Sequence, residues 1–76
     1  MAKEIVLTNK IRELRFFSDE MTQKELARKA GVSRQTIIAI EAGNYSPSLK
    51  LAFSIAEVFS AEITEVFGYE IKETKS

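Results

Sequence analysis

A single glycine, Gly31, separates two short segments of this chain that each have the pattern of an amphipathic helix. The first segment, 23–30, would bury a face made of Leu26, Ala27 and Ala30. Glycine adopts the left-handed conformation at a helix C-terminus without a penalty from Cβ. Ser33 then caps a further helix that runs from Arg34 to about Ala42. The chain therefore contains two short helices joined by a tight turn, and the rest of the fold has to be built around this unit.

Capping and packing signals lie on both sides of the turn. Thr22 and Glu25 have the spacing of a capping box, in which the Thr22 hydroxyl accepts from the Glu25 amide and the Glu25 carboxylate reaches back to Thr22. Ala27 is small, as a close crossing of the two helices requires. Val32 and Ile37 are expected to fill the space between these helices, and Ile40 lies inward three residues after Ile37.

Three more helices are expected around this unit. The first runs from Asn9 to about Phe17, with Thr8 or Asn9 as its cap, and its inward residues are Ile11, Leu14 and Phe17. A fourth helix follows a turn, with Ser48 as the favoured cap and Ser46 as the alternative. Its inner face would hold Leu49, Ala52, Phe53, Ala56 and Phe59. A last short helical segment, ending at Gly68, holds Ile63, Val66 and Phe67.

Both flanks of the helical region have the composition of short strands. Residues 4–7 and 69–72 are rich in β-formers and pair either with each other or across a dimer, and the sequence does not choose. The predicted fold class is all-α, with five helices and these two short flanking strands. We expect one domain over residues 1–76, with a core over 9–69 and the helix-turn-helix unit over 22–42, because a chain this short has no surface left for a second core.

Composition excludes several kinds of site. The chain has no cysteine and no histidine, so disulfides, thiolate nucleophiles and cysteine-based zinc sites are ruled out. No Gly-rich phosphate loop and no carboxylate cluster with metal-ligand spacing is present, and a serine nucleophile would lack its base. We therefore predict no enzymatic activity, no cofactor and no metal. Without a signal peptide or an apolar span of about 18 residues, the protein is expected to be soluble and cytoplasmic.

Charge is unevenly distributed along a chain whose net charge is zero. Residues 9–36 hold seven basic and four acidic side chains, a net charge of +3, whereas residues 37–76 hold three basic and six acidic ones, a net charge of −3. Neutrality is unusual for a protein that binds phosphates, but a basic front half can still face them.

Two short helices joined by a three- or four-residue turn form the DNA-binding helix-turn-helix, whose second helix lies in the major groove. The sequence closely resembles the Cro-like phage-repressor family, also called the xenobiotic-response-element family, over roughly residues 9–69, and is most similar to its compact stand-alone regulators. The residues that carry the resemblance are Met21-Thr22-Gln23, Gly31-Val32-Ser33-Arg34-Gln35-Thr36-Ile37, Glu41-Ala42-Gly43, Tyr45, Pro47-Ser48-Leu49, Ala56 and Phe59. It implies a lambda-repressor-like domain.

The resemblance also implies a role for each position of the motif. Gln23 would bind a backbone phosphate, and Ser33 would cap the recognition helix and touch phosphate. Arg34 and Gln35 would read bases, since arginine pairs with guanine and glutamine with adenine. The outer face of the same helix would present Thr36, Ile38 and Ala39, with Ala39 facing the groove most plainly. Residues that would hold the phosphate chain without specifying sequence are Asn44, Tyr45 and Ser48.

Some positions depart from the family pattern or allow two readings. Ile38 stands where a polar residue is common and Asn44 where a lysine is common, which predicts weak or salt-sensitive binding. Arg15 and Glu41 are expected to form a partly buried ion pair. The basic residues that are either phosphate contacts or solvated surface charges are Lys10, Arg12, Lys24, Arg28 and Lys29. The apolar residues that either pack internally or form a dimer interface are Phe16, Phe17, Leu51, Ile55 and Val58.

These observations predict a sequence-specific regulator of transcription. It would bind double-stranded DNA as a homodimer on a palindromic operator and act as a repressor, with no membrane association and no small-molecule ligand. The alternative is a protein-interaction module, or an antitoxin-like partner protein, that uses the same fold. Arg34 and Gln35 discriminate the two, because only a DNA reader depends on them.

Overall fold

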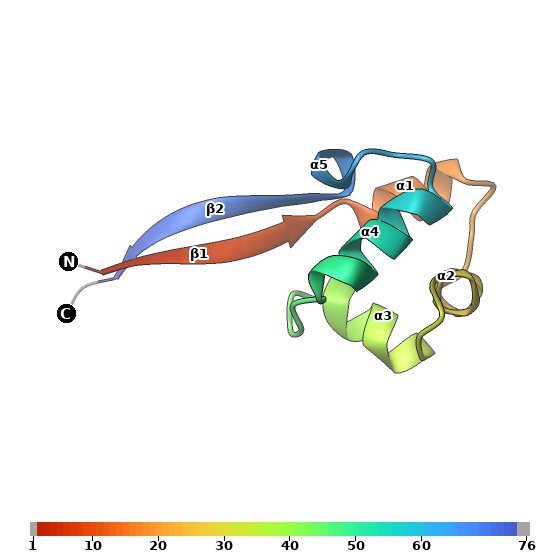
Figure 1. The fold of residues 1–76 in the computed structure, drawn as a ribbon, viewed down its shortest axis with the longest axis horizontal. Helices are drawn as coiled ribbons and strands as arrows, with labels where there is room; N and C mark the ends of the chain where they lie inside the picture. Colours follow the sequence, from red (N-terminus) through yellow and green to blue (C-terminus); the bar gives the residue numbers. More distant parts are fainter. Residues whose placement is uncertain (1, 75–76) are drawn as a thin grey trace.

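A two-stranded ribbon projects from one side of a body of five helices in the computed structural model, which describes residues 2–74 (Figure 1). The molecule measures 44 × 22 × 21 Å, and the ribbon accounts for its long axis. In chain order the elements are β1 (Ala2–Asn9), α1 (Ile11–Phe17), α2 (Gln23–Ala30), α3 (Arg34–Glu41), α4 (Leu49–Val58), α5 (Ile63–Val66) and β2 (Phe67–Thr74).

The five predicted helices are confirmed, with one shifted start. The first helix begins at Ile11, not at Asn9, because Asn9 is the last residue of β1. Asn9 nevertheless serves that helix, since its side-chain oxygen accepts the backbone N–H of Ile11 at 3.2 Å. The predicted end of α5 at Gly68 is wrong, because Phe67 is already extended and opens β2.

Serine and threonine caps start three of the helices as predicted. The hydroxyls of Thr22, Ser33 and Ser48 accept the backbone N–H three residues on, at 3.0, 3.2 and 3.1 Å. Each cap satisfies one of the amides that a helix leaves unpaired at its N-terminus. The second half of the capping box expected at Glu25 is not formed among the described residues. A return bond of that kind occurs before α5, where the Glu62 N–H donates to the Glu65 carboxylate at 2.9 Å.

The fold is not purely all-α, because the two flanking segments expected as short strands form a sheet beside the five helices. They pair antiparallel with each other, and both strands run beyond the predicted ranges 4–7 and 69–72. In the register, Ile5 lies opposite Ile71 and Leu7 opposite Tyr69. Pairs of β-branched and aromatic side chains on one face stabilise such ladders, which explains why this stretch extends rather than continuing the helices.

The core lies where all five helices meet, and α3 is fixed to it through Ile37 and Ile40. Its buried members are Ile11, Met21, Leu26, Ala27, Ile37, Ile40, Ala52, Ile55, Ala56 and Val66. Three predicted core residues are wrong: Phe17 is 80% exposed, and Leu49 and Phe53 are exposed as well. Phe17 ends α1, where the chain turns away, so its side chain passes beyond the core.

The stripe Leu51, Ile55 and Val58 is not an exposed surface of α4, so its assignment to a dimer interface is wrong. Ile55 is fully buried, and Leu51 and Val58 pack against the core. α4 contacts both α2 and α5, so more than one of its faces is covered. Periodicity identified an apolar helix correctly but could not tell which of two adjacent faces the neighbouring helices would cover.

Replacing Gly31 with alanine is expected to lower the free energy of unfolding by about 1–2 kcal/mol. Gly31 has a φ of +77°, and no atom lies within 4 Å of the position its Cβ would take, so the cost is one of backbone conformation alone. Urea unfolding of Gly31→Ala and of Gly31→Asn measures it, and asparagine should cost less because it tolerates this conformation. Equal stability of the glycine and alanine proteins would contradict the assignment.

Candidate nucleic-acid interface

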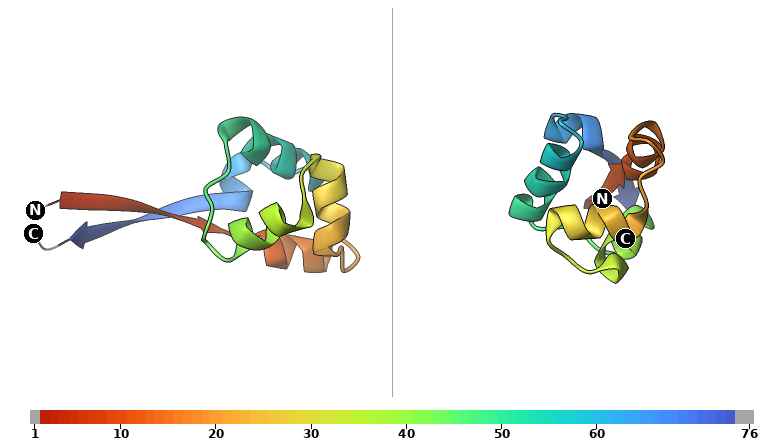
Figure 2. Two further views of the ribbon diagram at one scale, coloured as in Figure 1. Left: turned by 90° about the horizontal axis from the view of Figure 1, so that it is seen from below. Right: turned by 90° about the vertical axis from the view of Figure 1, so that its right-hand side faces the viewer.

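α2 and α3 meet through the turn at 31–33 and leave one side of α3 uncovered. α3 packs inward through Ile37 and Ile40. Seen from below, it lies at the surface of the body with no other element across it (Figure 2, left). A helix exposed along one side and fixed along the other has the form of an element that enters a major groove.

Arg34 and Gln35 occupy the first turn of α3, and both side chains are exposed. No hydrogen bond or ion pair within residues 2–74 engages either of them. The Ser33 cap fixes the backbone from which they project, since its Oγ accepts the N–H of Thr36. These two side chains are therefore available to an external partner at a rigid position.

The remaining predicted positions on α3 differ in exposure. Ile38 is 39% exposed, whereas Ala39 is half-buried, so Ile38 projects further than the residue expected to face outward most plainly. Thr36 is half-buried, with its hydroxyl 2.9 Å from the Ser33 Oγ. Ala42, the exposed C-cap of α3, continues this face and was not among the predicted residues. Ala42 lies seven residues, or about two helical turns, after Gln35, so both residues lie on the same face of α3.

A concave basic surface lies beside the start of α3. Gln23, at the N-terminus of α2, and Arg34 line it together with further residues, which are Arg12, Arg15, Thr22 and Lys24. The helix N-terminus directs unpaired amides towards an anion in the same place. The sequence alone did not decide whether Arg12 and Lys24 contact phosphate or are solvated surface charges. The structure brings them together with Gln23 and Arg34. This grouping depends on the path of the chain from α1 to α2, so it could not be predicted from the sequence.

The loop after α3 holds the other three predicted positions. Asn44, Tyr45 and Ser48 are exposed. The loop is held against α3, because the Asn44 N–H donates to the Ala39 carbonyl at 2.9 Å. The Ser48 hydroxyl caps α4. All three thus lie near the C-terminal end of α3, opposite the end that carries Arg34.

The predicted ion pair between Arg15 and Glu41 is confirmed and joins α1 to α3. It is bidentate, with Nε and one terminal nitrogen of Arg15 at 2.8 and 3.0 Å from the two carboxylate oxygens. A third donor of Arg15 reaches the Met21 carbonyl at 2.9 Å. The two side chains are only 16% and 10% exposed. The pair holds the C-terminal end of α3 to the body and takes Glu41 out of the exposed face.

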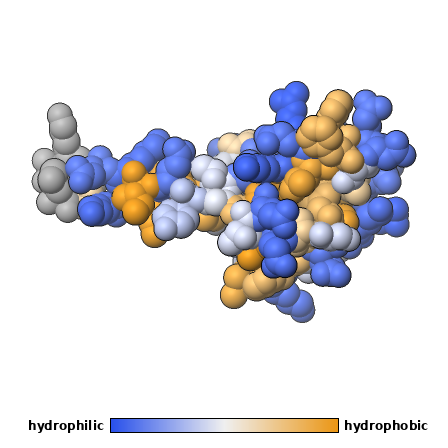
Figure 3. Space-filling view, turned by 90° about the horizontal axis from the view of Figure 1, so that it is seen from above, coloured by the Kyte–Doolittle hydropathy of each residue, from blue (hydrophilic) through white to orange (hydrophobic). Residues whose placement is uncertain are grey.

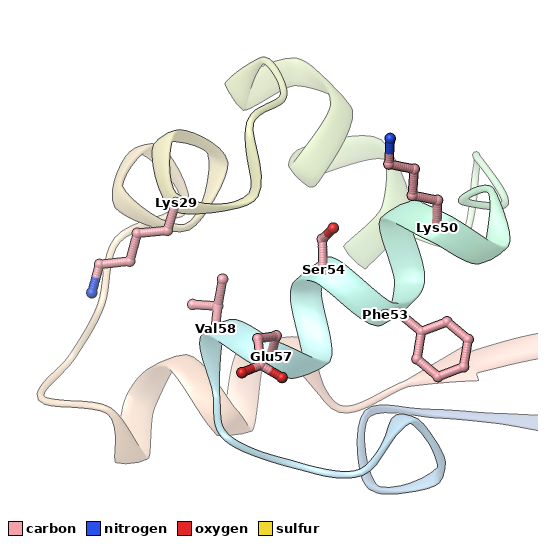
Figure 4. A pocket seen from close by; sticks show the side chains of 6 residues that line it. All are labelled: Lys29, Lys50, Phe53, Ser54, Glu57 and Val58. Carbon is pink, nitrogen blue, oxygen red and sulfur yellow. The ribbon is translucent and has the colours of Figure 1, made fainter.

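A second shallow cleft lies between α2 and α4, on another side of the body (Figure 4). It is lined by Lys29, Lys50, Phe53, Ser54, Glu57 and Val58. Lys29 and Lys50 point away from each other, and Phe53 turns outward, so the polar groups do not converge on one point. We assign no function to this cleft.

Residues 2–74 hold no cluster of three or more potential metal ligands. None of the helices in this part of the chain is long and apolar enough to span a bilayer.

Comparison with known proteins identifies the family. The profile of the helix-turn-helix family matches residues 11–66, from α1 to α5. The chain is 54% identical to a helix-turn-helix transcriptional regulator of Methanocaldococcus jannaschii over 67 residues, which cover 88% of this chain and all of that protein. It is 44% identical to the regulator YgzD of Bacillus subtilis over 84% of this chain and 96% of YgzD. The cryptic phage CTXphi transcriptional repressor RstR of Vibrio cholerae is 34% identical over 80% of this chain and 54% of RstR. This chain belongs to the helix-turn-helix family of DNA-binding transcriptional regulators.

Proposed function

We propose that this protein recognises a specific sequence in double-stranded DNA and represses transcription by occupying it as a homodimer. The observation that carries the proposal is the exposed first turn of α3, where Arg34 and Gln35 are held by a capped backbone and engaged by no other residue of the described chain. Side chains of these two types form bidentate hydrogen bonds with base edges in the major groove.

Base recognition would lie on α3. In this proposal Arg34 donates to O6 and N7 of a guanine, and Gln35 pairs with N6 and N7 of an adenine. Ile38, exposed one turn further on, contacts a thymine methyl group with Ala39 beside it. Thr36 stays with the Ser33 cap, so it contributes mainly through the conformation of the first turn.

Positioning on the backbone would come from two sites on either side of α3. At one end, Gln23 and the α2 N-terminus bind a phosphate beside Arg12 and Lys24. At the other, the exposed loop residues Asn44, Tyr45 and Ser48 contact the phosphate chain. Phosphate contacts of this kind fix the orientation of a recognition helix without reading sequence.

A two-fold dimer on a palindromic operator fits the size of this surface. One helix of eight residues reads only a few base pairs, and two copies on half-sites about 34 Å apart multiply the affinity of each. RstR, one of the relatives, is named as a transcriptional repressor, and this supports repression by occupancy. No ligand-binding element is needed for regulation of this kind, because protein concentration alone sets occupancy.

The alternative function, a protein-interaction module, would use exposed aromatic side chains. Phe16 and Phe17 are both exposed and contact each other edge to face, with ring centroids 5.3 Å apart. Such a module would not depend on Arg34 or Gln35, so the same variant separates the two functions.

Substitution of Arg34 and Gln35 together by alanine is expected to weaken binding to random duplex DNA about tenfold at low salt. The loss follows from one cation and one hydrogen-bonding amide leaving the contact surface. Fluorescence anisotropy over a series of salt concentrations measures it. The wild type should weaken steeply as salt rises, and the variant less steeply, because one fewer counterion is released.

The matched control is Lys29→Ala, which also removes one positive charge but from a side chain that points away from α3 (Figure 4). It should leave binding near the wild-type value. If neither the wild type nor the control binds at low salt, DNA binding through α3 is rejected and the interaction module becomes the leading function. If all three proteins bind alike, DNA is bound elsewhere than at α3.

A further inference from the structure

One face of the β1–β2 ribbon is apolar and largely uncovered. Ile5 lies opposite Ile71, and Leu7 lies opposite Tyr69. Cross-strand partners, and residues two apart on one strand, point to the same face of a sheet. The four side chains are between 44% and 66% exposed. Hydrophobic atoms are visible on the ribbon well away from the helical body (Figure 3). We call this set, Ile5, Leu7, Tyr69 and Ile71, the ribbon face.

Hydrogen bonds join the ribbon to the helical body at its inner end. There the Lys10 N–H donates to the Val66 carbonyl at 2.8 Å, and the Asn9 side-chain amide donates to the Ile40 carbonyl at 3.1 Å. The outer parts of both strands extend away from every helix (Figures 1 and 2). Two strands alone are at best marginally stable in water and need a further strand or helix on their apolar face. The outer part of the ribbon would therefore be stabilised by a partner that covers its apolar face.

We propose that a second copy of this chain supplies that partner, with the two ribbon faces packed against each other across a two-fold axis. The proposal rests on the dimer of the proposed function and names the surface that forms it. Sheets pack face to face about 10 Å apart, with side chains interdigitating between them. Eight apolar side chains, four from each copy, then form a small second core.

Charge favours a second copy over a partner of another kind. Among the strand residues that the structure describes, this face carries one charged pair, Lys3 opposite Glu73 near the outer end, and these two charges cancel. An identical face is therefore not repelled, whereas a strongly acidic or basic partner would find no excess of opposite charge. A two-fold axis also places the same patch on both sides of the contact, as most homodimers do.

The length of the ribbon suits two adjacent half-sites. Eight residues at about 3.3 Å each span about 26 Å, so two fully overlapped ribbons separate their inner ends by that length. The inner end is bonded to Ile40 in α3, and α3 adds about 1.5 Å of rise per residue beyond it. A separation on the order of 34 Å between recognition helices is within this reach.

The first test exchanges one cross-strand pair on each side of the ribbon. Ile5→Thr with Ile71→Thr changes the ribbon face, and Glu4→Thr with Lys72→Thr changes the neighbouring pair on the opposite face. Threonine favours strands, so both double variants should keep the ribbon. Sedimentation equilibrium should show a dimer for wild type and control, and a dissociation constant at least about 100-fold higher for the isoleucine variant.

A second test reports the contact directly and changes a single residue of the ribbon in each variant. The chain has no cysteine, so a single Ile5→Cys substitution gives one reactive thiol near mid-ribbon. A short bismaleimide should join two copies of Ile5→Cys efficiently and two copies of Glu4→Cys poorly. Preferential linkage at Glu4→Cys, or a dimer that persists in the isoleucine variant, would overturn the proposal, and so would a monomeric wild type.

Failure of this proposal is separable from failure of the proposed function. A monomeric wild type that still binds duplex DNA through Arg34 and Gln35 would reject the ribbon contact and leave DNA recognition standing. A dimer linked through the ribbon that has no affinity for DNA would reject DNA recognition and leave the ribbon contact standing.

Discussion

Ile37→Ala is expected to lower the free energy of unfolding by about 3–4 kcal/mol. Ile37 lies on α3, is fully buried, and joins this helix to the core. Removing three carbon atoms loses their transfer free energy and leaves a cavity that the neighbouring side chains fill only in part. A chain of this length has a total stability of roughly 4–11 kcal/mol, so the variant should be close to unfolding at ambient temperature. Urea unfolding followed by circular dichroism measures the difference.

Its matched control is the next residue on the same helix. Ile38→Ala makes the same chemical change at a side chain that is 39% exposed, and should cost about 1 kcal/mol or less. Ile37→Val, which removes one methylene group, should cost about 0.5–1.5 kcal/mol, well below the loss in Ile37→Ala. Equal losses at positions 37 and 38 would mean that α3 is not packed as described.

Arg15→Ala is the second large effect, with an expected loss of about 3 kcal/mol. The substitution leaves the Glu41 carboxylate, 10% exposed, without its bidentate partner, and it leaves the Met21 carbonyl without a donor. A charge left buried and unpaired costs more than the intact pair contributes. Unfolding curves at neutral pH measure the loss.

A double variant separates the two contributions. Replacing the pair by apolar side chains of similar size, Arg15→Met with Glu41→Leu, should recover most of the loss, because no charge then remains buried. Failure to recover would indicate that packing of the arginine stem, rather than the charge, is what matters. A loss below about 1 kcal/mol in the single variant would place the pair among ordinary surface ion pairs.

Local signals in the sequence predicted much of this fold. The caps at Thr22, Ser33 and Ser48 and the left-handed Gly31 depend on nearest neighbours along the chain, and the structure confirms all four. Burial on α4 depends instead on which helices lie beside it: Ala52 and Ala56 are buried as predicted, whereas Leu49 and Phe53 are exposed and Ile55 is buried in their place. Pairing between strands at opposite ends of the chain was likewise left open, because either strand could have found its partner in another chain.

In the candidate interface, too, features set by one helix could be predicted from the sequence, whereas features that depend on several helices could not. Exposure of Arg34 and Gln35 followed from the periodicity of one helix. The grouping of Arg12 with Gln23, Lys24 and Arg34 did not, because it brings together α1, α2 and α3. Ile38 and Ala39 lie 100° apart around their helix, and which of them projects further is set by packing against the rest of the body rather than by sequence spacing.

The hydrogen bond from Asn9 to the Ile40 carbonyl has a mechanical consequence. It joins the inner end of the ribbon to the last turn of α3, at a carbonyl that also accepts the Gly43 N–H at 3.0 Å. This contact couples the ribbon to α3, so in the proposed DNA complex a tilt imposed on the outer strands would also tilt α3. A dimer held through such ribbons would tolerate little variation in the number of base pairs between its two half-sites.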